Sequence, residues 1–186
     1  MNEPFLQRAL QLALERHSGQ WRDGQTPLPY VFHPIGVMHN LIHTGGIRDE
    51  SILAAALLHD LVEETETSIL EIQSEFGSRV AELVREVTRI EPTESERRGL
   101  TAEEIWELRT NRLLAEISAM STDAQCIKLA DRLDNLRESS ATRSPKKHER
   151  YLRQTIRILA IIPEDVNKPL WHAVEGWTKK KTGRNC

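Results

Sequence analysis

Cysteine is scarce in this sequence, with two residues in a chain of 186. Two cysteines are too few for the disulfide framework of a small secreted protein, and Cys126 lies in an apolar run where a reduced core thiol is expected. No apolar run approaches the roughly 20 residues that a membrane span requires, and the N-terminus has no signal-peptide profile. We therefore expect a cytoplasmic protein that does not enter a membrane.

A strong charge of one sign is also absent. The chain has 25 Lys and Arg against 28 Asp and Glu, a formal net charge of −3 at pH 7. This mild acidity gives no overall attraction to nucleic acid, so we do not expect nucleic acid as a partner. The length fits one domain with a substantial core and leaves no space for a second domain of comparable size.

Alternating strand patterns are missing, and apolar residues recur at helical spacing. Leu6, Leu10 and Ala13 form one such stripe, and a helix beginning at Pro34 is expected to end at Gly45-Gly46. Asp49 has the position of a cap for the next helix. The pattern predicts an all-α fold, a single helical bundle without internal repeats.

The expected organisation is one domain over residues 1–186. Its motifs occupy residues 6–137, C-terminal helices residues 145–177 and a basic tail residues 178–186. The segment Ile90 to Gly99 is rich in Glu, Arg, Thr and Ser, so we expect a mobile surface loop there. The apolar C-terminal residues leave open whether they pack on the core or on a second subunit in a homodimer; they are Leu170, Trp171, Val174 and Trp177.

The most informative stretch runs from Leu53 to Glu64. Its six-residue start contains only Ala and Leu, which predicts a helix buried on all sides. It ends in His59, Asp60, Glu63 and Glu64. Buried His and Asp are costly without partners, and a divalent cation partners several at once. Neighbouring helical residues leave the axis about 100° apart, so His59 and Asp60 can approach one ion, and each glutamate lies one turn beyond one of them.

Two other segments of the chain supply further ligands for such a metal centre. His33 comes just before a helix that Pro34 can open, and Asp131 ends a second apolar approach. Two imidazoles and two carboxylates suit a first-row transition metal such as Mn, Fe or Co. Calcium and magnesium favour all-oxygen ligands, and the cysteines of a structural zinc site are missing from the set. We predict that His33, His59, Asp60 and Asp131 bind a Mn²⁺-like ion.

These residues and the short sequence motifs around them resemble the HD-domain metal-dependent phosphohydrolases, and in particular the hydrolase domain of the RelA/SpoT family. The resemblance spans roughly Leu6 to Arg137 in order. The segments that carry it are Gly19-Gln20, Pro29-Tyr30, His33-Pro34, His59 to Thr65, Phe76-Gly77, Leu83 to Thr88, Lys128 to Leu133 and Asn135 to Arg137.

The resemblance implies both a reaction and roles for further residues. The bifunctional relatives continue into a synthetase domain, whereas this chain ends about fifty residues after the last motif, as in the stand-alone small alarmone hydrolases. These remove pyrophosphate from the 3′ position of guanosine tetra- or pentaphosphate, a reaction of the stringent response. By resemblance, Glu63 and Glu64 orient or deprotonate water or protonate the leaving group. Arg22 contacts the base or a phosphate, and Asn135 contacts the ribose.

At three positions the chain differs from the residues that are usual in this family. The acid pair is usually Glu-Asp, but here it is Glu63-Glu64. A Lys often follows the Arg, but here Asp23 reverses the charge near an expected polyphosphate. Asp134 stands where His or Tyr is common before the Asn.

Alternatives follow from these departures. One is an HD phosphohydrolase acting on another nucleotide, such as an NADPH phosphatase, and another is a metal-bound regulatory module whose catalysis has decayed. Separately, His39 and His43 have the i,i+4 spacing of a metal-binding pair, although they match no ligand of the family, and a surface role is preferred. His17 is interpreted as structural.

Overall fold

The computed structural model describes residues 4–22, 27–142 and 144–179. The described residues form helices and contain no strand beyond one isolated bridge between Trp21 and Pro29, which confirms the predicted all-α class. The helices are α1 (Phe5–Arg16), α2 (Phe32–His43), α3 (Glu50–Leu58), α4 (Leu61–Glu64), α5 (Ile69–Phe76), α6 (Ser78–Val87), α7 (Glu94–Arg97), α8 (Ala102–Ala119), α9 (Thr122–Thr142), α10 (Pro145–Leu159), a 3-10 turn (Glu164–Val166) and α11 (Lys168–Lys179).

Helix α3 forms the centre of the core. Every residue from Ile52 to Leu58 is buried, as its run of Ala and Leu predicts. Asp49 caps the helix by accepting hydrogen bonds from the backbone N–H groups of Ser51 and Ile52, at 2.9 and 3.1 Å. Since α3 packs against α1, α2, α6 and α9, its C-terminal end reaches the middle of the molecule.

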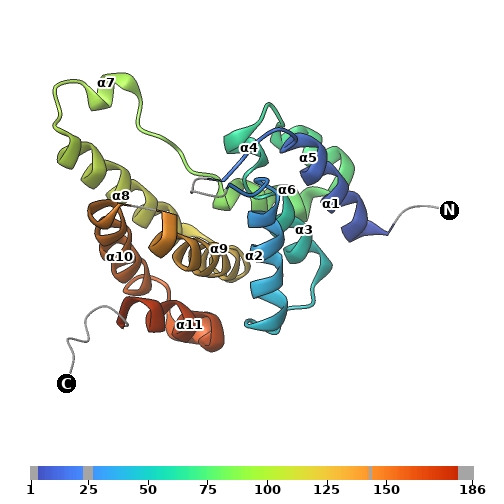
Figure 1. Ribbon diagram of the computed structural model, residues 1–186. Coiled ribbons are helices and arrows are strands. Elements are labelled where there is room, and N and C mark those ends of the chain that lie inside the picture. Colours follow the sequence, from blue (N-terminus) through green and yellow to red (C-terminus); the bar gives the residue numbers. More distant parts are fainter. Residues whose placement is uncertain (1–3, 23–26, 143, 180–186) are drawn as a thin grey trace.

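Helix α9 divides the molecule. In Figure 1 it runs between α2 and α3 on one side and α8 and α10 on the other. Leu129, Leu133 and Leu136 are buried on this helix and fix it against the core. Its polar residues therefore lie where the two sides meet.

Two predicted helix boundaries are wrong, and both corrections concern the candidate ligands. Helix α2 begins at Phe32, so His33 lies inside its first turn. Pro34 is tolerated there because the first N–H groups of a helix have no partner within it. The stretch from Leu53 to Glu64 is also not one helix. Helix α3 ends at Leu58, and Asp60, with φ −94° and ψ −7°, forms a corner before α4.

The segment predicted to be a mobile loop between residues 90 and 99 contains the one-turn helix α7. Thr93 and Glu96 form a reciprocal capping box around it, and Thr101 and Glu104 form another at the start of α8. These pairs satisfy backbone N–H groups that a short helix would otherwise leave without partners. The composition of the segment concealed this local order.

The C-terminal apolar residues pack on the core of the same chain. Leu170 and Val174 are fully buried, and the indole N–H of Trp171 donates to the carbonyl of Ile162 at 3.0 Å. Within the described part of the chain, no helix combines the length and the apolar character needed to cross a membrane.

Candidate metal centre and its cavity

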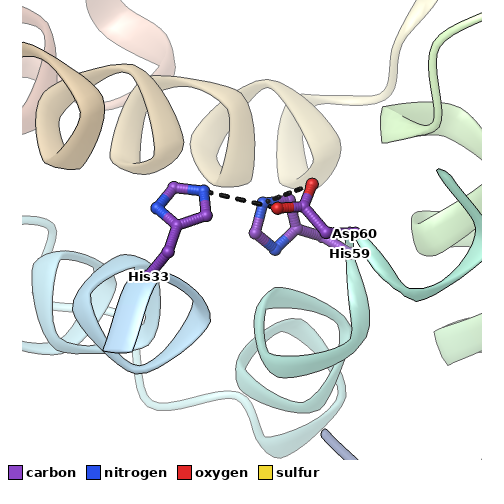
Figure 2. Close-up of side chains that lie close together, drawn as sticks. All are labelled: His33, His59 and Asp60. Atoms are coloured by element: carbon purple, nitrogen blue, oxygen red, sulfur yellow. Dashed lines mark ion pairs between the residues drawn. The ribbon is translucent and has the colours of Figure 1, made fainter. Parts of the chain in front are cut away.

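Three side chains with metal-ligating atoms meet at the corner that follows α3. One atom each from His33, His59 and Asp60 lies within 4.8 Å of the others (Figure 2). Nε2 of His59 is 3.1 Å from Oδ1 of Asp60, and Nε2 of His33 is 3.5 Å from Oδ2 of the same carboxylate. Both histidines are buried, with 3% of their surface exposed, so the cluster has little access to water.

Asp131 reaches the same cluster from α9. Its Oδ1 lies 3.3 Å from Nε2 of His33, and its Oδ2 lies 3.3 Å from the ammonium of Lys128. The four residues predicted as metal ligands are thus brought together from three separate segments. Helix α2 supplies one, the corner after α3 supplies two and α9 supplies the fourth.

The orientation of His59 favours a cation at this position. Its Nδ1 is 2.9 Å from the carbonyl of Ala56, which can only accept a proton. The Nδ1–H therefore donates there, and Nε2 is turned towards Oδ1 of Asp60 at 3.1 Å. A buried ring nitrogen beside a carboxylate favours positive charge between them, which a metal ion can supply.

The charges around His33 lead to the same conclusion. Burial lowers the pKa of His33, but hydrogen bonds to Asp131 and Asp134 and the charge of Asp60 raise it to about 9. Burial raises the pKa of Asp131, yet Lys128 and His33 hold it well below its usual range. The site thus favours added positive charge. A divalent ion meets that demand, and the imidazole and carboxylate donors fit a first-row transition metal.

Tyr30 holds the Asp60 carboxylate through a hydrogen bond. Its hydroxyl donates to Oδ2 of Asp60 at 2.7 Å. Burial and the neighbouring carboxylate raise the pKa of Tyr30, so the phenol keeps its proton. The Tyr30 ring stacks on the buried His17 at 4.6 Å, and Nδ1 of His17 is 2.7 Å from the side-chain oxygen of Gln20. This packing agrees with the structural role expected for His17.

A cavity of about 760 Å³ opens from the metal centre towards α8 and α10. His33, Asp60 and Asp131 lie at one end of it. Its wall also carries many cationic side chains, contributed by several segments. These are Arg22, Arg89, Arg109, Lys128, Arg132, Lys147 and Arg150. Glu91 and Glu116 also line the wall, and Arg109 pairs with Glu91 at 2.8 Å. The remaining cations suit a ligand that carries several negative charges.

The two residues predicted to contact substrate both line this cavity and contact each other. Arg22 donates to Oδ1 of Asn135 at 3.1 Å and also pairs with Glu138. Asn135 in turn donates to Oδ1 of Asp131 at 2.5 Å. The cavity wall is therefore connected directly to a candidate metal ligand. Asp23, the charge reversal noted in the sequence, lies outside the described residues.

Glu63 and Glu64 both line the cavity but differ in their surroundings. Glu63 accepts three hydrogen bonds from Arg89: from the backbone N–H at 2.8 Å, from Nε at 3.0 Å and from a terminal nitrogen at 2.9 Å. Glu64 reaches solvent, but part of its side chain is shielded from water. This shielding, together with the negative charges of Asp60 and Glu63, raises its pKa. Glu63 is thus held in place, whereas Glu64 takes up a proton more readily than an ordinary glutamate.

Several residues at this site have no role that was predicted from the sequence. Lys128 and Asp134 lie three positions from Asp131 on α9, so helical spacing could have identified both. Arg89 and Tyr30 are brought in by tertiary packing, and no local pattern marks their contacts. His39 and His43 have rings 4.4 Å apart on the exposed face of α2 and take no part in the cluster.

The fold and the cluster define a class of protein. A sequence model of the HD domain matches residues 9–162, and the chain belongs to this family. HD domains bind a divalent metal, in keeping with the ligand cluster described above.

Individual proteins with similar sequences carry a more specific name than the family does. The chain is 40% identical over 131 residues to a guanosine-3′,5′-bis(diphosphate) 3′-pyrophosphohydrolase, MESH1, of Xenopus tropicalis, over 70% of this chain and 66% of that protein. It is 34% identical over 175 residues to a protein of the same enzyme name from Aquifex aeolicus, over 94% of this chain and 22% of that protein. It thus spans about two thirds of the animal relative and about a fifth of the bacterial one.

A solved structure of a metazoan SpoT orthologue that hydrolyses ppGpp has a similar fold. The TM-score is 0.82 and the sequence identity is 29%, with 97% of each chain covered.

Proposed function

We propose that this protein is a metal-dependent pyrophosphohydrolase that converts guanosine tetraphosphate (ppGpp) into GDP and pyrophosphate. The observation that carries the proposal is the buried cluster of His33, His59 and Asp60 at the end of a cavity lined with cations. The enzyme names of the relatives support this substrate. We further propose that the described helices belong to one HD domain and that the protein is cytoplasmic.

We propose that His33, His59, Asp60 and Asp131 hold the ion, with Mn²⁺ as the preferred metal. Their mixture of imidazole and carboxylate donors supports this choice. When bound, such an ion supplies a Lewis acid for a phosphoryl oxygen and acidifies water. The protein contributes the rest: Tyr30 holds Asp60, Lys128 holds Asp131, and burial keeps bulk water from the cluster.

The two glutamates take different roles in this proposal. The oxygen of a water molecule bonds to the phosphorus, and the bond from that phosphorus to the 3′ oxygen of the ribose breaks. Glu64 accepts a proton of the water and gives it to the departing 3′ oxygen, because its raised pKa and exposed position suit proton transfer at the cavity edge. Glu63, held through both oxygens by Arg89, orients the reacting groups.

The nucleotide occupies the remainder of the cavity. Arg22 contacts its base or a phosphate and Asn135 its ribose, since both line the wall beside Asp131. Arg109, Lys147 and Arg150 line the same cavity and face the charged phosphates. This distribution of charge favours a highly phosphorylated nucleotide over a neutral ligand.

The proposal is tested by incubating the purified protein with Mn²⁺ and guanosine tetraphosphate and separating GDP by anion-exchange chromatography. We expect metal-dependent release of GDP that Asp60→Ala abolishes. Glu64→Gln should lower kcat about 10²–10⁴-fold, the usual contribution of a general acid or base. A protein that binds Mn²⁺ but releases no GDP would contradict the proposed substrate. NADPH in a parallel reaction tests the other nucleotide named from the sequence.

A further inference from the structure

Asp134 contacts the face of His33 that points away from the cluster. The Nδ1–H of His33 donates to Oδ2 of Asp134 at 2.7 Å. A carboxylate can only accept, so this contact fixes a proton on Nδ1 and turns Nε2 towards Asp60 and Asp131. Asp134 lies one turn after Asp131 on α9, so a single helix supplies a candidate ligand and the support of another.

Gly36 provides the space that Asp134 occupies. A Cβ atom at position 36 would lie 2.2 Å from Oδ1 of Asp134 and 2.9 Å from its Cγ, closer than any real contact. Gly36 is inside α2, where glycine costs about 0.5–1 kcal/mol relative to alanine. The helix therefore carries an unfavourable residue at the position where a methyl group would displace the carboxylate.

We propose that Asp134 is a positioning residue for the metal centre and that Gly36 is required for it to act. This inference rests on the metal site of the proposed function but not on the nucleotide.

The two histidines obtain their orientation in different ways. His59 donates to the carbonyl of Ala56, three residues earlier in the chain. No side-chain substitution removes that acceptor. His33 depends on a side chain 101 residues away, and its partner carries a full negative charge that makes the imidazole a stronger ligand. Loss of Asp134 should therefore weaken metal binding through His33 alone.

The test measures the affinity of the protein for Mn²⁺ in the absence of nucleotide. Electron paramagnetic resonance gives the concentration of free Mn²⁺. Asp134→Ala should weaken binding about 10–100-fold, the usual effect of removing a group that orients a ligand. Asp134→Asn should recover part of the loss, because its amide oxygen can still accept from His33. Gly36→Ala should also weaken binding, because the new methyl group displaces the carboxylate.

The decisive variant combines Gly36→Ala with Asp134→Ala. We expect it to bind Mn²⁺ as Asp134→Ala does, because the methyl group no longer meets a carboxylate. Gly176→Ala is the matched control, since α11 leaves open space around that glycine and its Mn²⁺ affinity should be unchanged. Melting curves followed by circular dichroism in EDTA show whether each variant is folded.

Three results would overturn the inference. They are unchanged affinity in folded Asp134→Ala, a Gly36→Ala defect that persists undiminished when Asp134 is absent, or no Mn²⁺ binding by the natural chain. Failure of the proposed function looks different. A chain that binds Mn²⁺ with the expected dependence on Asp134 but does not hydrolyse guanosine tetraphosphate refutes the substrate and leaves the positioning role standing.

Discussion

The two walls of the cavity are built by different physical means. The inner wall, α2 and α3 with the corner at His59 and Asp60, rests on apolar side chains such as Leu57 and Leu58, which are at most 1% exposed. The outer wall, α8 and α10, buries fewer apolar residues, such as Leu113 and Ile158, and adds exposed ion pairs between its two helices. Because buried packing is stronger than exposed ion pairing, the ligand cluster is held more firmly than the surface opposite it.

The contacts between α8 and α10 illustrate the outer wall. Arg157 pairs with Glu107 at 2.8 Å, Arg153 pairs with Glu103 at 2.9 Å, and the side chain of Gln154 donates to Thr110 at 3.0 Å. The two ion pairs weaken in salt and adjust at little cost, whereas the bond to the buried Thr110 is uncharged and does not. This difference indicates that the reacting groups are held in fixed positions, whereas the outer wall of α8 and α10 can adapt to a ligand.

The largest expected effect comes from the inner wall. Leu57→Ala should destabilise the protein by about 2–5 kcal/mol, because it leaves a cavity beside the helix that carries His59. Urea denaturation in EDTA measures the loss. Leu114→Ala on α8 is the matched control, and its loss should be smaller because Leu114 is only partly buried. Equal losses would remove the distinction between the walls.

A smaller effect is expected from one polar contact of the inner wall. Tyr30→Phe removes the hydroxyl that donates to Asp60 and should cost about 1.5–3 kcal/mol, the range for a hydrogen bond to a charged group. The same urea experiment measures it. A cost near zero would show that water replaces the phenol and that the inner wall is less shielded than its geometry indicates.

The corresponding polar contact of the outer wall should matter less. Arg157→Gln removes the pair with Glu107, and we expect a loss of about 0.2–1 kcal/mol in low salt, as for other exposed pairs. The difference from the natural chain should shrink further in 1 M NaCl, where charges are screened over about 3 Å. A loss as large as that of Tyr30→Phe, or one independent of salt, would contradict the comparison.

The smallest effect concerns pH at α7. Hydrogen bonds from Thr93 and Arg112 lower the pKa of Glu96 from its ordinary value of 4.5 to about 2. The unfolded chain thus binds this proton more readily than the folded one. The stabilisation is complete above pH 4.5 and is lost as the pH falls towards 2. Hydrogen exchange at Glu96 and Arg97, corrected for intrinsic rates, should show it.

Glu96→Gln is the control for that measurement, because a neutral side chain removes the pH dependence. The α3 amides in the same samples serve as a reference for global unfolding. Loss of protection at α7 and α3 together would mean that acid unfolds the whole chain and that α7 has no separate response.

Much of the fold followed from the sequence because its signals are local. The Ala and Leu run of α3 and the Asp49 cap each depend on residues within a few positions of one another. The confirmed all-α class followed from such patterns. The wrong boundaries at Pro34 and after Leu58 involve helix ends, where backbone geometry is decided by tertiary contacts.

At the candidate site the four predicted ligands were found by chemistry and resemblance, and the structure brings them together. Their surroundings could not be predicted in the same way. The contact of Arg89 with Glu63 crosses 26 residues, and that of Tyr30 with Asp60 crosses 30. Such pairs depend on how helices pack, which no local pattern contains.

Gly36 and Asp134 also limit the order in which this site can change. A carboxylate at position 134 fits its present place only when position 36 has no Cβ. A lineage must therefore hold the glycine before the aspartate is useful. Once the aspartate supports His33, replacing the glycine becomes harmful although alanine is the better helix residue. The aspartate thus restricts position 36 to glycine, whereas the glycine places no such restriction on position 134.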